Sequence, residues 1–154
     1  MAGASHTGKA GQLAAMAEFL LAGYNVAIPE VDTGDDVYVV HDLMGRFWRV
    51  QVKTGTAERM QYGHRAQFWI PLAQLHRRIL PAFIYVLALR RGVGDWEFVV
   101  IPRHDLRREH RAHDLGSVRE DDLRLYLAFH EADVVCSGRS LQRYRNNFDL
   151  TAYR

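Results

Sequence analysis

Apolar side chains recur at helical spacing in the first part of the chain. Between residues 8 and 22, the side chains that share one stripe of such a helix are Leu13, Met16, Ala17, Leu20 and Leu21. Thr7 is a candidate N-cap, and Gly23 followed by Tyr24 is typical of a helix C-terminus. The pattern therefore predicts an amphipathic helix over residues 8–22 that packs through its leucine-rich stripe.

Alternation with a period of two predicts strands in the rest of the chain. The first strand covers residues 25–28, and residues 36–42 and 47–53 form a hairpin around a loop of about four residues. Residues 54–67 are predicted as loop with a short irregular piece, followed by a helical turn after Pro71. Strands at 82–89, 96–101, 123–129 and 134–136, a polar helix at 102–113 and a tail of turn and short helix complete the order. This order predicts a mixed α/β sandwich.

Composition places the chain among ordinary globular proteins. Its 154 residues, 48% hydrophobic and 25% charged, suit a single domain over residues 1–154 and exclude disordered, collagen-like and coiled-coil chains. The one cysteine, Cys136, excludes an internal disulfide and a cysteine-based zinc site. The longest apolar run, residues 79–89, is too short to cross a bilayer, and the N-terminal residues lack the apolar core of a secretion signal. We therefore expect a cytoplasmic protein with no membrane partner.

Charge adds two observations. The net charge is only +2, so a nucleic-acid surface would have to be a local patch rather than a property of the whole molecule. Almost all of the 20 cationic residues are arginine, and the only lysines are Lys9 and Lys53. A chain that otherwise uses arginine has kept lysine at these two places.

The predicted hairpin brings three chemically different side chains to one face. If Asp42 pairs with Phe47, Asp36 lies directly opposite Lys53, and alternation places Gln51 on the same face as both. The opposite face collects the core residues Val37, Val39, Trp48, Val50 and Val52. A carboxylate, an amide and an ammonium group therefore converge on the polar face.

The segment GDDVYVVHDLMGRFWRVQVKT resembles the core of the PD-(D/E)XK nuclease superfamily, in which an aspartate on one strand is followed by a hairpin and an acid-x-Lys motif. The preceding helix is similar in position and length, so the resemblance covers residues 8–54. The most similar branch contains small homing endonucleases and Holliday-junction-resolvase-like proteins. The resemblance implies an α/β fold with a mixed central sheet flanked by helices, a restriction-endonuclease-like α-β-β-β-α-β core, and divalent-metal-dependent cleavage of DNA.

The resemblance also implies site residues. Asp36 matches the motif aspartate, with Asp35 as the alternative; Gln51 matches the second metal ligand, and Lys53 matches the lysine. Gln12 takes the position of the helix glutamate. Asp36 and Gln51 would hold Mg²⁺ (or Mn²⁺), whose preferred ligands are hard oxygen atoms. Glutamine replaces an acid at two of these positions, so we expect weaker metal binding than in a three-acid site.

Arginines in the second half are candidates for contacts with the DNA backbone: Arg107, Arg111, Arg139, Arg143 and Arg145. Duplex cleavage needs two active centres, so the resemblance further implies a homodimer. A second hypothesis is a catalytically degenerate nucleic-acid-binding or scaffold subunit, which the two glutamines favour. A third is a small-molecule-binding α/β protein whose polar hairpin face is only solvated, and a zinc site that uses His110 and His113 is a fourth.

Overall fold

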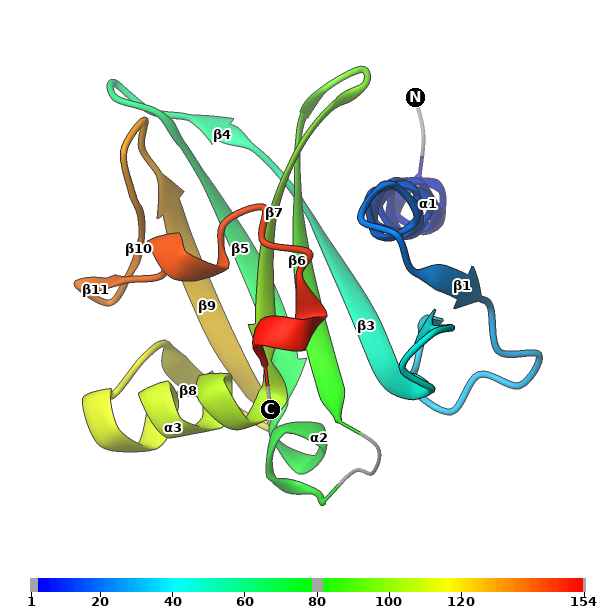
Figure 1. The fold of residues 1–154 in the computed structure, drawn as a ribbon. Helices are drawn as coiled ribbons and strands as arrows, with labels where there is room; N and C mark the ends of the chain where they lie inside the picture. Colours follow the sequence, from blue (N-terminus) through cyan, green and yellow to red (C-terminus); the bar gives the residue numbers. More distant parts are fainter. Residues whose placement is uncertain (1–2, 79–81, 154) are drawn as a thin grey trace.

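The computed structural model describes residues 3–78 and 82–153, in which two β-sheets share one core (Figure 1). The first sheet has the order β1 (Asn25–Ala27), β2 (Val37–His41), β3 (Arg46–Thr56), β6 (Phe83–Gly92) and β7 (Asp95–Pro102). Strands β3 and β6 are parallel, and the other neighbours are antiparallel. This mixed sheet confirms the predicted α/β class.

The second sheet branches from the end of β3. Its order is β11 (Arg139–Ser140), β10 (Val134–Cys136), β9 (Asp122–Phe129), β5 (His64–Pro71) and β4 (Glu58–Arg59), and β8 (Ser117–Arg119) also pairs with β9. Because β4 follows β3 after a single residue, the chain passes from one sheet into the other at this point. The predicted loop over residues 54–67 is therefore wrong: β3 continues to Thr56, and β4 and the first half of β5 lie in this segment.

Helices cover the ends and one side of the sheets. Helix α1 (Ala4–Leu21) packs on the first sheet, and α2 (Leu72–His76) and α3 (Arg103–His113) lie side by side at one end of the molecule (Figure 1). The tail forms the 3₁₀ turns η1 (Gln142–Tyr144) and η2 (Leu150–Ala152). No helix in residues 3–78 or 82–153 is both long and apolar enough to span a bilayer.

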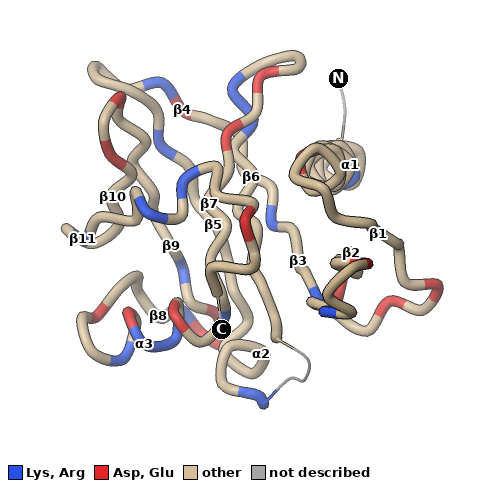
Figure 2. Tube along the Cα trace, viewed as in Figure 1, with Lys and Arg blue, Asp and Glu red and all other residues tan. Residues whose placement is uncertain are grey.

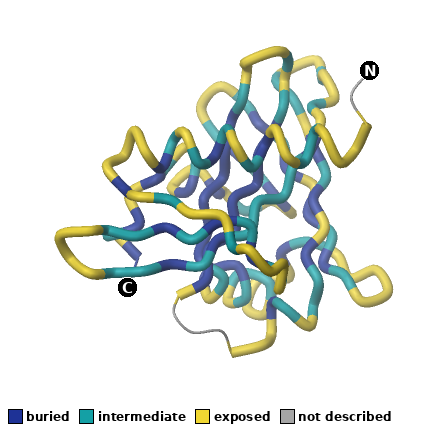
Figure 3. The backbone as a smooth tube through the Cα atoms, turned by 90° about the vertical axis from the view of Figure 1, so that its right-hand side faces the viewer, coloured by how far each residue is buried: buried dark blue, intermediate teal, exposed yellow. Residues whose placement is uncertain are grey.

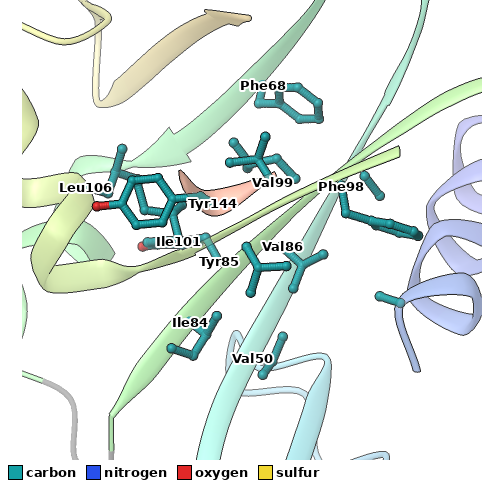
Figure 4. Packing of buried hydrophobic residues seen from close by; sticks show 14 of the residues in the cluster. Val50, Phe68, Ile84, Tyr85, Val86, Phe98, Val99, Ile101, Leu106 and Tyr144 are labelled. Atoms are coloured by element: carbon teal, nitrogen blue, oxygen red, sulfur yellow. The ribbon is translucent and has the colours of Figure 1, made fainter. Parts of the chain in front are cut away.

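The core lies between the two sheets and around β6. Seven successive residues of β6, from Phe83 to Leu89, are buried, as expected for a strand that is covered on both faces (Figures 3 and 4). The second sheet contributes one face of each long strand, including Phe68 and Ile70 of β5 and Leu125 of β9. The first part of the apolar run at 79–89, residues 79–81, lies outside the described residues.

Helix α1 packs through a different face from the one predicted. Its buried residues are Gly11, Ala15 and Phe19, whereas Leu20 is 53% exposed and Leu21 is 82% exposed. Small side chains let the helix approach β3 closely, and an added Cβ at Gly11 would overlap the hydroxyl of Thr54. The helix also begins at Ala4, with Gly3 rather than Thr7 at the N-cap position. The predicted end is confirmed, because Gly23 has φ = +90° and Tyr24 is buried.

The β2–β3 hairpin forms with a register that differs by two residues from the predicted one. The observed partners include His41 with Arg46 and Val37 with Val50, so Asp42 belongs to the turn. An even shift leaves every side chain on its predicted face. Its consequence is that Asp36 lies beside the backbone around Gln51 rather than directly opposite Lys53.

Candidate active site

Asp36 lies just before the first residue of β2, at the point beyond which this strand no longer covers the edge of β3. Its backbone N–H donates to the carbonyl of Val50 (2.8 Å), and its carboxylate Oδ2 accepts a hydrogen bond from the N–H of Val52 (2.7 Å). The carboxylate therefore takes the place of the next acceptor along the missing strand. Since these two bonds reach the residues on either side of Gln51, Asp36 is fixed against the strand segment that carries the QxK motif.

Gln51 and Lys53 lie on the face of β3 that is turned toward the second sheet. Thr54 faces α1, whereas an added Cβ at Gly55 would contact Phe68 of β5. Because side chains alternate along a strand, Gln51 and Lys53 share the side of Gly55. The Gln51 Oε1 atom is buried and has no hydrogen-bond partner among the described residues. A buried amide oxygen without a donor is costly, and such a site favours a ligand that supplies positive charge.

Burial moves the pKa values of the two charged groups toward each other. Loss of solvent raises the pKa of Asp36, against the lowering effects of the Val52 N–H and of the charge on Lys53. Burial lowers the pKa of Lys53, while the negative charges of Asp36 and Asp122 oppose this change. A half-buried carboxylate and a half-buried ammonium group thus lie within electrostatic reach of each other at the open edge of β3.

Helix α1 delivers Gln12 to the same place. The Gln12 amide nitrogen donates to the backbone carbonyl of Asp36 (2.8 Å), and its Oε1 accepts from the Lys9 ammonium (3.2 Å). A hollow of about 280 Å³ lies here, lined by Ser5, Gly8, Lys9, Gln12, Asp36 and Val52. Asp36 therefore lies between Gln12 and Lys9 on the α1 side of β3 and Lys53 on the other side. Glu18 instead lines a different hollow, with Trp96 and Phe148.

Asp35 forms a buried ion pair with Arg49. Its side chain is 2% exposed, and its Oδ2 accepts a hydrogen bond from Nε of Arg49 (2.6 Å) and forms an ion pair with Nη2 of the same side chain (2.6 Å). Of the two adjacent aspartates, Asp36 is the one on which the charge of Lys53 acts and which has no ion-pairing arginine in the described part of the chain. The geometry thus favours Asp36 over Asp35 as the metal-binding acid.

The arginines predicted to contact DNA fall into two groups. Arg107 and Arg111 lie on α3, where basic residues are concentrated, and Arg143 is exposed beside the ring of Tyr144 (Figure 2). Arg139 forms an ion pair with Glu109 (2.9 Å), and Arg145 pairs with Glu97 and donates to the carbonyl of His130 (2.7 Å). The side chains of the second group thus already have acceptors within the protein.

The other candidate chemistry has little support in the geometry. The described residues contain no group of three or more His, Cys, Asp or Glu side chains that could hold a metal ion, and Nδ1 of His110 lies 2.8 Å from the carbonyl of Leu115. Cys136 is buried, and burial raises the pKa of its thiol.

Two residues near the site were not predicted from sequence. Lys9 had a signal, because it is one of only two lysines in an arginine-rich chain. Asp122, whose charge acts on Lys53, had none: it lies on β9, and only the pairing of β9 with β5 brings it near β3.

Among solved structures, the bacterial homing endonuclease I-Ssp6803I is similar to this chain. The TM-score is 0.60 and the sequence identity 18%, over 98% of this chain and 92% of that chain. No protein-family model matches the sequence, and no characterised protein matches it by sequence search. The similarity therefore establishes a fold similar to that of a bacterial homing endonuclease, across almost the whole chain.

Proposed function

We propose that the protein is a divalent-metal-dependent DNA endonuclease whose active site contains Asp36, Gln51 and Lys53. The observation that carries this proposal is the buried Oε1 of Gln51, which has no donor among the described residues and lies beside a carboxylate fixed against the same strand segment. The fold similarity to a homing endonuclease supports the same reaction class.

The residues present fit a magnesium or manganese ion. Asp36 supplies a carboxylate and Gln51 a neutral amide oxygen, both of them hard donors that suit Mg²⁺. When bound, the ion lowers the pKa of a coordinated water and stabilises negative charge on the phosphate. One carboxylate and one amide leave the site with little negative charge of its own, so binding should depend partly on the phosphate of the DNA.

The remaining residues orient the attacking water, hold Asp36 in place and contact the phosphates of the DNA. The lowered pKa of Lys53 makes its neutral amine more accessible than that of an exposed lysine, so this side chain suits orientation or deprotonation of the attacking water. Gln12 holds the backbone of Asp36 and, through its Oε1, the ammonium of Lys9. This arrangement keeps a second cation on the α1 side of Asp36. Arg107, Arg111 and Arg143 would contact the DNA backbone, as would Arg139 and Arg145 if they leave their acidic partners.

Nicking of plasmid DNA tests the proposal. Purified protein with supercoiled plasmid or branched DNA and Mg²⁺ or Mn²⁺ should produce nicks that disappear with EDTA. Lys53→Ala and Asp36→Ala should each reduce the rate by about 100-fold or more, since each removes a group that acts on the reacting phosphate or its metal. Arg59→Ala, an exposed change on β4, is the matched control and should cleave normally.

Cleavage that survives both site variants would indicate a contaminating nuclease and contradict the proposal. We also expect a homodimer, because cutting both strands of a duplex needs two centres, and a cytoplasmic location. Sedimentation of the purified protein measures the first, and fractionation of cells measures the second.

A second candidate function is DNA binding without cleavage. Glutamine at both position 12 and position 51 favours it, because each removes a negative charge that a metal ion would use. Metal-independent DNA binding together with no nicking in Mg²⁺ or Mn²⁺ would support this function over the enzyme.

A further inference from the structure

A second hollow lies beside the candidate active site, on the same side of β3. Its volume is about 460 Å³, and it is lined by Thr33, Asp35, Arg49, Pro71, Ala73, Gln74, Arg77, Arg78 and Phe83. We call it the arginine hollow, after Arg49, Arg77 and Arg78. It draws its walls from the loop before β2, from β3 and β6, and from α2 and the residues that follow it.

Arg49 is held in a fixed orientation at the wall of this hollow. The buried carboxylate of Asp35 binds its Nε and Nη2, and the Arg49 side chain remains 26% exposed. Gln74 is held on the opposite side, because its Oε1 accepts from the hydroxyl of Tyr85 (2.9 Å) and its amide donates to the carbonyl of Gly34 (3.2 Å). A pre-positioned guanidinium loses less entropy when it binds an anion.

The hollow carries more positive than negative charge. Asp35 offsets one arginine, and within residues 3–78 and 82–153 no carboxylate lies at ion-pair distance from Arg77 or Arg78, which are both exposed. Helix α3 extends the basic region, since burial and the charges of Arg111 and Arg107 lower the pKa of His76, the residue before Arg77. An anion is the ligand that complements this surface.

The distance between the hollow and the candidate active site indicates which phosphate of the DNA this anion would be. Arg49, Gln51 and Lys53 occupy alternate positions of β3, and Phe83 and Tyr85 lie beside the first two on β6. Residues two apart on a strand are about 7 Å apart. Successive phosphates on one DNA strand advance about 3.4 Å along the helix axis. The hollow is therefore one or two phosphates away from a phosphate bound at Gln51 and Lys53.

We propose that the arginine hollow binds a phosphodiester group of the substrate DNA, one or two nucleotides from the bond that is cleaved. This inference rests on the proposed function, because it takes DNA as the ligand. Its role is to fix the register of the strand at the active site, with guanidinium groups that need not take part in the chemistry.

Fluorescence anisotropy with a labelled DNA duplex in EDTA tests the inference without cleavage. Arg77→Ala/Arg78→Ala should weaken binding about tenfold or more at low salt. Loss of two phosphate contacts should reduce the slope of log K against log salt by about 1.8, at about 0.9 per phosphate. Arg59→Ala removes another exposed arginine, which lies past Thr56 at the far end of β3, and Thr56 is about 23 Å along the strand from Arg49. This variant should bind as the wild type does. Both variants change exposed residues, and equal melting temperatures will confirm that they fold.

The outcomes separate this inference from the proposed function. If Arg77→Ala/Arg78→Ala has unchanged affinity and salt slope while the wild type nicks DNA normally, the phosphate site in the arginine hollow is overturned. The proposed endonuclease activity then stands. Weakened binding in this variant with no nicking by the wild type would support the hollow and overturn the endonuclease. A third outcome concerns inorganic phosphate at constant ionic strength. If phosphate raises the melting temperature of the wild type but not of the variant, and the variant binds DNA normally, the hollow binds a free anion and the DNA assignment is overturned.

Discussion

Gln51 occupies the position where an acid would give a divalent cation a second negative charge. Its Oε1 is buried without a partner among the described residues, while the carboxylate of Asp36 is fixed by the N–H of Val52. The QxK spacing in the sequence was sufficient to predict that Gln51 and Lys53 share a face, because alternation along a strand does not depend on register. It was not sufficient to place Asp36, which lies just before the first paired residue of β2.

Restoring the acid should strengthen metal binding. Gln51→Glu adds a negative charge at the same distance from the backbone, so the Mg²⁺ concentration at half-maximal nicking should fall about tenfold, equivalent to about 1.4 kcal/mol. A metal titration of the nicking rate measures the shift. The isosteric change Gln12→Glu on α1 provides the comparison, because Gln12 already uses both amide atoms in hydrogen bonds. An unchanged or higher midpoint for Gln51→Glu would mean that this oxygen does not contact the metal.

Asp36→Asn should lower the cleavage rate and keep or raise the thermal stability. Burial raises the pKa of Asp36 in the folded protein, so ionisation costs folding free energy as the pH rises past the ordinary carboxyl value of 3.8. Asparagine can still accept from the Val52 N–H but carries no charge. The variant should therefore lose cleavage, by about 100-fold or more, yet melt at the same or a higher temperature than the wild type at pH 7.

The pH dependence provides the check on that prediction. Below the ordinary pKa, Asp36 is neutral in both the folded and the unfolded chain, so the difference in melting temperature should shrink as the pH falls below about 4. A difference that grows toward low pH, or an Asp36→Asn protein that is less stable at pH 7, would contradict the assigned cause of the shift.

At the scale of elements, helix α1 shows how tertiary contacts override a local pattern. Its leucines form a regular stripe in the sequence, yet the face that meets β3 consists of Gly11, Ala15 and Phe19. The reason is distance: the helix must come close enough for Gln12 to reach the backbone of Asp36, and the small residues Gly11 and Ala15 allow that approach next to Gln12. The sequence alone carries no signal of how near a helix will lie to its sheet.

Two glycines of α1 give a matched test of this close approach. Gly11→Ala introduces a methyl group that overlaps the Thr54 hydroxyl and lies 3.1 Å from its Cβ and Cγ2 atoms, whereas a Cβ at Gly8 meets nothing within 4 Å. Gly8→Ala should raise the free energy of unfolding by about 0.5–1 kcal/mol through helix propensity. Gly11→Ala should lower it by about 1–2 kcal/mol, because overpacking outweighs that gain.

Denaturant unfolding of the two variants measures the difference. Gly11→Ala should also reduce the nicking rate, since a displaced α1 moves Gln12 away from Asp36. The double variant Gly11→Ala/Thr54→Ala removes the overlapping hydroxyl and should recover part of the stability. Equal stabilisation by both single changes would show that α1 does not depend on a close contact at Gly11.

At the scale of the whole molecule, the C-terminal segment connects the two sheets. Asn146 exchanges hydrogen bonds with the backbone of Phe98 on β7, and the hydroxyl of Tyr144 donates to the buried carboxylate of Asp105 on α3 (2.9 Å). Arg145 reaches Glu97 of β7 and the carbonyl of His130, just after β9. The mixed α/β class and the first helix, strand and hairpin could be predicted from alternation and from family resemblance. These bonds could not, because they join residues 15 to 48 positions apart that share no local pattern.

Arg143 and Arg145 therefore offer a direct comparison between a surface charge and a buried one. The side chain of Glu97 is 4% exposed, and Arg145 and Arg91 are its ion-pair partners among the described residues. Removing Arg145 leaves Glu97 with the longer contact to Arg91, at 3.3 Å. Arg145→Ala should thus lower the free energy of unfolding by about 3 kcal/mol, as expected when one partner of a buried pair is lost. Arg143→Ala, on the exposed side of the same turn, should change it by no more than about 0.5 kcal/mol. Urea unfolding of the two variants measures both values, and Glu97→Gln/Arg145→Ala should recover part of the lost free energy of unfolding because the buried charge is then gone.

An Arg145→Ala protein as stable as the wild type, but with weakened DNA binding, would instead show that Arg145 leaves Glu97 to contact DNA.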